Sequence, residues 1–141
     1  MLSIYRASAG SGKTHTLTQE YLLLLFRELQ QHRDHFLPHS RILAVTFTKK
    51  ATAEMKERIL KALYGLTQDP LSSKFYKKLH KELALNAHEI QQQACKLLID
   101  ILTDYNRFSV STIDGFFQQV IRTFALDLGL SSSYELALDS K

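Results

Sequence analysis

The chain has little that would place it outside the cell or in a membrane. Its 141 residues include a single cysteine, Cys95, which excludes an internal disulfide and favours a reducing compartment. It has no long hydrophobic run near its N-terminus, since the run Tyr21–Phe26 is far too short to cross a bilayer. No basic-then-apolar signal peptide precedes that run. We therefore expect a cytoplasmic protein with no membrane partner.

A strong excess of one charge is also missing. Lysine and arginine number 18 against 14 acidic residues, a net charge of +4 that permits a nucleic-acid partner without proving one. Hydrophobic residues make up 45% of the chain and charged residues 23%, which is ordinary for a folded globular domain. The length and composition together predict one domain and argue against disorder throughout the chain.

Hydrophobic patterns along the chain predict an α/β fold. Short strands are expected at residues 2–5, 41–47 and 108–113, and the second is apolar enough to be buried on both faces. Helical spacing predicts helices at residues 14–29, 49–66, 74–85, 88–104 and 114–128. Strands that alternate with helices indicate a parallel sheet flanked by helices. Two helices show clear core stripes, one with Met55, Ile59 and Leu63, the other with Phe117, Ile121, Phe124 and Leu128.

The sequence RASAGSGKTHTL at residues 6–17 fits a phosphate-binding loop with alanine at its first position. Small residues let successive backbone N–H groups cradle phosphate oxygens, and the helix that follows adds the positive end of its dipole. Lys13 is expected to reach the β- and γ-phosphates, and the Thr14 hydroxyl to bind Mg²⁺. The alternative is a chance glycine-rich turn with a surface lysine. The predicted nucleotide-binding residues are Ala9, Gly10, Ser11, Gly12, Lys13, Thr14 and His15.

Three motifs in order resemble those of UvrD/Rep-type DNA helicases of superfamily 1. ASAGSGKT resembles their Walker A loop, and AVTFTKKATAEMKERI at residues 44–59 resembles motif Ia. STIDGFFQQVI at residues 111–121 resembles the later motif that contains Thr-x-His-x-Phe. The resemblance covers residues 1–130, and the forms IYRASAGSGKT and STIDGFF are most similar to the RecB/AddA-type helicase–nuclease branch.

The resemblance implies an ATP and magnesium site at the loop and single-stranded DNA at the strand ends. The implied DNA-contacting residues are Thr46, Phe47, Thr48, Lys49, Ser111 and Thr112. An aromatic ring such as Phe47 can stack on a base, although a strand-end phenylalanine can equally belong to the core. Asp114 stands where the family commonly has histidine, which puts its contact with DNA in doubt. An alternative role for Asp114 is the Walker B carboxylate.

The resemblance also implies how the chain is organised. Residues 1–141 would form the N-terminal part of a RecA-like P-loop NTPase domain, with a helical insertion around 68–106 and the start of a truncated continuation at 129–141. The whole protein would be an ATP-dependent helicase or helicase–nuclease of DNA repair or recombination. Its partners would be single-stranded DNA, the rest of the helicase polypeptide and, in the helicase–nuclease branch, a nuclease subunit. We expect this chain alone to be inactive, because hydrolysis needs a water-orienting carboxylate and an arginine on the γ-phosphate. The alternative is a self-contained small P-loop NTPase or kinase.

Other candidate residues favour plainer interpretations. His32, His35 and His39 have loose metal-ligand spacing, but polar surroundings favour a solvated linker. Cys95 is expected to be a buried structural thiol. The basic residues of 74–81 indicate a solvated helix face or a secondary DNA-facing surface.

Overall fold

The computed structural model describes residues 13–32 and 37–125, so predictions on residues 1–12, 33–36 and 126–141 lie outside the described residues. The helices are α1 (Lys13–Gln31), α2 (Lys49–Gln68), α3 (Tyr76–Leu83), α4 (Ala87–Thr103) and α5 (Ile113–Phe124). Short 3-10 helices occur at η1 (Pro38–Arg41) and η2 (Tyr105–Arg107). The strands are β1 (Ala44–Thr46) and β2 (Val110–Thr112). None of the described helices is both long and apolar enough to span a membrane.

The described sheet consists of two short parallel strands. Ala44 pairs with Val110 and Thr46 with Thr112, and α2, α3 and α4 make the connection between the strands. This agrees with the predicted parallel α/β arrangement, while the predicted strand at residues 2–5 lies outside the described residues. The expectation that β1 is buried on both faces is wrong, because Val45 is 44% exposed whereas Ala44 is buried. In the described part of the chain, β1 is buried only on the face that carries Ala44.

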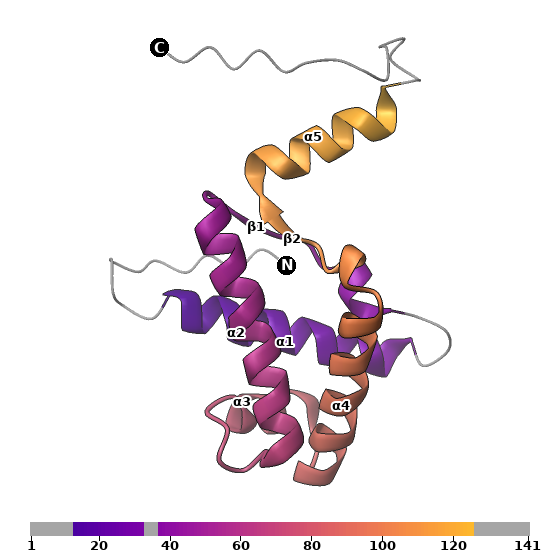
Figure 1. Cartoon of the computed structure of the whole chain (residues 1–141). Helices are drawn as coiled ribbons and strands as arrows, with labels where there is room; N and C mark the ends of the chain where they lie inside the picture. The colour runs from indigo at the N-terminus through magenta and orange to yellow at the C-terminus, as the bar shows by residue number, and fades with distance from the viewer. Residues whose placement is uncertain (1–12, 33–36, 126–141) are drawn as a thin grey trace.

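Helices form most of the described structure. In Figure 1, α2 and α4 lie side by side and α1 crosses them, with α3 at the far end of α2. The predicted stripe of Met55, Ile59 and Leu63 on α2 is confirmed, since all three side chains are at most 2% exposed. The core is built from buried side chains of α1, α2 and α4, among them Leu22, Leu25, Phe26, Leu66, Ile90, Leu97 and Ile101.

Polar contacts cap the start of α4 and link α3 to α1. The Asn86 side chain accepts a hydrogen bond from the Glu89 backbone N–H, and the Glu89 carboxylate accepts one from the Asn86 N–H. This capping box satisfies two N–H groups that the first turn of α4 leaves free. Lys78 on α3 is paired with Glu20 on α1, and Arg27 on α1 with Glu82 on α3 at 3.2 Å. These two ion pairs join α3 to α1 at the surface, where such pairs contribute little to stability.

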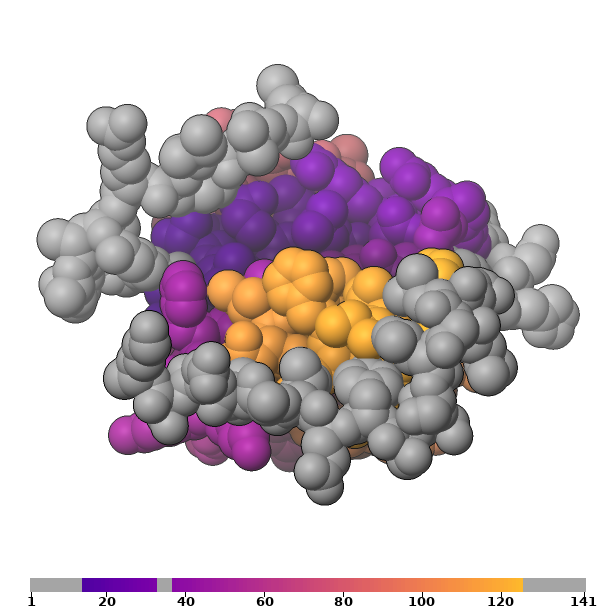
Figure 2. All heavy atoms as spheres, turned by 90° about the horizontal axis from the view of Figure 1, so that it is seen from above, coloured from indigo at the N-terminus to yellow at the C-terminus, as the bar shows by residue number. Residues whose placement is uncertain are grey.

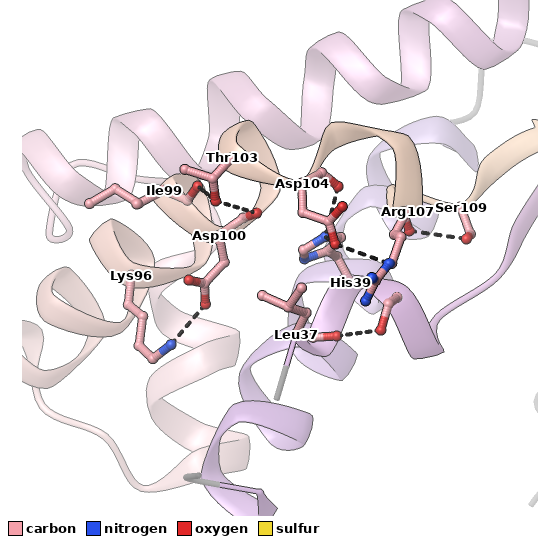
Figure 3. Close-up of polar contacts among 10 residues, drawn as sticks. Leu37, His39, Lys96, Ile99, Asp100, Thr103, Asp104, Arg107 and Ser109 are labelled. Carbon is pink, nitrogen blue, oxygen red and sulfur yellow. Dashed lines mark hydrogen bonds and ion pairs between the residues drawn. The ribbon is translucent and has the colours of Figure 1, made fainter. Parts of the chain in front are cut away.

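His39 ties η1 to the end of α4, and its position corrects the expectation of a solvated linker. Its ring is fully buried, with Nε2 3.2 Å from the backbone carbonyl oxygen of Asp104. The Asp104 carboxylate lies 3.4 Å from Nε of Arg107, so one residue joins η1 and η2 (Figure 3). His35 lies outside the described residues. Among the residues that the structure describes, no group of histidine, cysteine or acidic side chains could hold a metal ion.

α5 departs from the predicted core helix. Phe117 and Phe124 are 57% and 52% exposed, although their spacing indicates burial; Leu128 lies outside the described residues. The helix leaves the end of β2 and points away from the helical body in Figure 1. Its atoms lie on the outer face of the molecule in Figure 2. The spacing correctly indicates an amphipathic helix, but no residue between Ile113 and Phe124 is fully buried in the described structure.

Candidate nucleic-acid interface and nucleotide loop

The parallel pairing of β1 and β2 brings the two predicted DNA-contacting segments together. Thr46 and Thr112 are register partners at the last positions of the two strands. The segment Phe47–Lys49 therefore leaves the sheet at the same edge as the start of α5. In parallel α/β sheets, ligands bind beyond the carboxyl ends of the strands, and this edge is of that kind.

Phe47 is the most exposed large hydrophobic side chain in the described structure, at 87%. It lies in the bend between β1 and α2. The alternative that Phe47 belongs to the core is therefore wrong. An exposed ring at the end of a parallel sheet offers a face on which an unpaired base can stack.

Thr48 and Thr112 cap the helices that begin at this edge, and the hydroxyl hydrogen of each stays available to donate. Thr48 Oγ1 accepts a hydrogen bond of 3.1 Å from the Ala51 N–H at the start of α2. Thr112 Oγ1 accepts one of 3.1 Å from the Gly115 N–H at the start of α5. A Cβ on Gly115 would lie 3.1 Å from that oxygen, so glycine keeps the cap open. A hydroxyl has one donor as well as its acceptor sites, so each threonine can still donate to a phosphate oxygen.

Thr46 has a more structural role than the sequence predicted. Its hydroxyl lies 2.6 Å from that of Thr52 and donates to the backbone carbonyl of Thr48 at 3.2 Å. These contacts hold the bend that carries Phe47 against the first turn of α2. We assign Thr46 to shaping this bend, and a direct contact with DNA stays a prediction.

A cavity of about 580 Å³ opens beside the strand ends. Three of the predicted DNA-contacting residues line this cavity: Lys49, Ser111 and Thr112. Lys56 and Tyr105, which the sequence analysis missed, line it as well. Lys56 lies seven residues after Lys49 on α2, so helical periodicity could have placed both on one face. No sequence signal pointed to Tyr105. The complete lining is Lys49, Thr52, Ala53, Lys56, Glu57, Leu60, Tyr105, Ser111, Thr112 and Gly115.

The predicted nucleotide loop lies largely outside the described residues, which include none of Ala9, Gly10, Ser11 and Gly12. Lys13 is the first residue of α1, so the helix begins directly after the glycine-rich sequence. The Thr14 carbonyl accepts a hydrogen bond of 2.7 Å from the Thr18 hydroxyl. The His15 ring stacks on Phe75, with the ring centroids 5.0 Å apart. Binding of phosphate, ATP or magnesium at these residues stays a prediction.

Asp114 lies exposed in the first turn of α5. A carboxylate there interacts favourably with the positive end of the helix dipole, so Asp114 has a structural role in stabilising the start of α5.

The remaining candidates are not part of the strand edge. In the basic segment, Lys78 is paired with Glu20, and the His80 ring Nδ1 lies 2.7 Å from the Leu85 carbonyl oxygen. Cys95 is exposed on α4, so the expectation of a buried thiol is wrong. Ala94 and Leu97 lie on the buried face of α4, and the helical turn between neighbouring residues points Cys95 away from that face.

Comparison with known proteins defines the class to which this arrangement belongs. The family model described as UvrD/REP helicase N-terminal domain matches residues 3–141, and the chain belongs to this family. No solved structure matches the chain.

Relatives of the chain include helicase–nuclease subunits and a DNA helicase II homolog. The chain is 32% identical over 133 residues to an ATP-dependent helicase/nuclease subunit of Lacticaseibacillus casei, covering 94% of this chain and 9% of that protein. It is 30% identical over 152 residues to RecB of the RecBCD enzyme of Haemophilus influenzae, covering 98% of this chain and 12% of that protein. It is 37% identical over 94 residues to a probable DNA helicase II homolog of Mycoplasma capricolum, covering 67% of this chain and 12% of that protein. The chain thus spans about a tenth of the length of these relatives.

Proposed function

We propose that this chain is the ATP-binding and single-stranded-DNA-contacting part of an ATP-dependent DNA helicase or helicase–nuclease of DNA repair or recombination. Residues 1–141 would belong to a RecA-like domain in which 68–106 is a helical insertion and 129–141 begins a continuation. ATP and magnesium would bind at Ala9–His15. The partners would be a nuclease subunit, together with the rest of a helicase polypeptide, and the location would be cytoplasmic.

The observation that carries this proposal is the shared edge at the ends of β1 and β2. The register pairing of Thr46 with Thr112 gathers an exposed phenylalanine, two capping threonines and Lys49 at that edge. A single strand needs faces for its bases and donors for its phosphates, and this edge provides both. A small self-contained NTPase or kinase is not favoured, because the family match covers residues 3–141.

Replacing Phe47 with alanine tests the proposed DNA contact. Loss of a stacking ring is expected to weaken binding to single-stranded DNA by about 1–3 kcal/mol, whereas the fold should be unchanged because the ring is 87% exposed. Fluorescence anisotropy with a labelled oligothymidylate measures the affinity. Tyr64→Ala is the matched control, since Tyr64 is an aromatic residue of α2 that is 58% exposed and does not line the strand-end cavity. Equal losses in both variants, or none in Phe47→Ala, would contradict the proposed contact.

A further inference from the structure

Lys56 is a cation held between the helical body and the strand-end cavity. It projects from α2, and its Nζ lies 4.9 Å from the ring centroid of Tyr105 and 5.5 Å from that of Phe108. Phe108 is buried, and Tyr105 is partly exposed. Contacts with two aromatic faces orient an ammonium group while adding no negative charge to it.

The charge of Lys56 is not neutralised by its surroundings. Within the described residues, no carboxylate forms an ion pair with Lys56, and the one carboxylate that lines the same cavity, Glu57, is paired with Lys61 at 2.6 Å. Partial burial lowers the pKa of Lys56, because desolvation disfavours its charged ammonium form. An anion that entered the cavity would restore the missing interaction.

The cavity beside Lys56 already has donors for such an anion. Lys49 and Lys56 line it from α2, and Ser111 and Thr112 line it from β2. Among the residues that line this cavity of about 580 Å³, these two cations and two hydroxyls are groups that can bind a phosphodiester oxygen.

We propose that Lys56, positioned by the rings of Tyr105 and Phe108, binds a backbone phosphate of the single strand that crosses the ends of β1 and β2. This inference rests on the proposed function, and it extends the DNA path from the Phe47 bend along α2 into the cavity. Tyr105 and Phe108 act as positioning residues, because they touch Lys56 and hold its ammonium group at the cavity.

The salt dependence of DNA binding tests the role of Lys56. Each phosphate contact to a single strand contributes about 0.7 to the slope of log affinity against log salt concentration. Lys56→Met keeps an apolar stem on the two rings and removes the charge, so the slope should become shallower by about 0.7. Lys56→Arg keeps the cation and should retain the slope. Oligothymidylate binding is measured by fluorescence anisotropy over a series of salt concentrations, with thermal unfolding as the check that each variant is folded.

Lys61→Met is the matched control. Lys61 lies on the same helix, is paired with Glu57 and does not line the strand-end cavity, so its loss should leave the slope unchanged. An unchanged slope in Lys56→Met, or an equal change in Lys61→Met, would overturn the assignment. If Phe47→Ala weakens binding while Lys56→Met has no effect, the proposed function stands and this inference fails. If neither variant affects binding, the proposed function fails as well.

Discussion

Replacing Lys13 with alanine is expected to weaken the binding of magnesium ATP by about 10- to 150-fold. The ammonium group of a Walker A lysine contacts the β- and γ-phosphates, and a hydrogen bond to a charged group contributes about 1.5–3 kcal/mol. A loss of this size corresponds to that range of affinity. Isothermal titration calorimetry of the chain and its variant with ATP and magnesium measures the effect.

Lys81→Ala serves as the control for this experiment. It removes a lysine of α3 that is exposed and far along the sequence from the loop, so it changes net charge equally without touching the predicted site. Its affinity for ATP should equal that of the parent chain. If Lys13→Ala also binds ATP with the parent affinity, Lys13 has no phosphate-binding role and the loop is an ordinary glycine-rich turn.

Replacing Leu63 with alanine is expected to destabilise the fold by about 2–5 kcal/mol, because it removes buried methyl groups and leaves a cavity. Leu63 is fully buried on α2, the helix that packs on both α1 and α4. A loss of this size is a large part of the roughly 5–15 kcal/mol that stabilises an ordinary domain. The midpoint of urea unfolding, followed by circular dichroism, measures the change.

Leu102→Ala is the matched control for the core substitution. It makes the same chemical change on α4, but Leu102 is 58% exposed, so its effect should stay within about 0.5 kcal/mol. Equal midpoints for Leu63→Ala and the parent chain would contradict the packing of α2 against α1 and α4.

Helix α2 could be predicted well because it buries one stripe of apolar side chains. Met55, Ile59 and Leu63 recur at helical spacing, and that spacing alone locates the face of α2 that meets the core. The boundaries also follow local chemistry, since Thr48 caps the start of α2. Burial of a whole element depends on what lies against it, and for that reason the apolar patterns of β1 and α5 predicted too much burial.

The candidate site was only partly visible in the sequence. Motif resemblance named Phe47 and Thr112, and their convergence needed only the assumption of parallel strands, which the register confirms. Tyr105 reaches the cavity because the chain turns through η2 after α4, and no local pattern records that turn. His39 was misassigned for a related reason: its burial depends on contact with Asp104 at the end of α4, 65 residues away in the sequence, and not on its polar sequence neighbours.

The preference between single-stranded and duplex DNA tests the proposed DNA contact at the strand ends most directly. An exposed ring there can stack on a base only where that base is not held in a duplex by its pairing partner, as in a single strand. Fluorescence anisotropy should compare a labelled oligothymidylate with a duplex of the same length at one fixed salt concentration, because the phosphate contribution depends on salt. We expect tighter binding to the single strand, and stronger binding to the duplex would contradict the proposed contact.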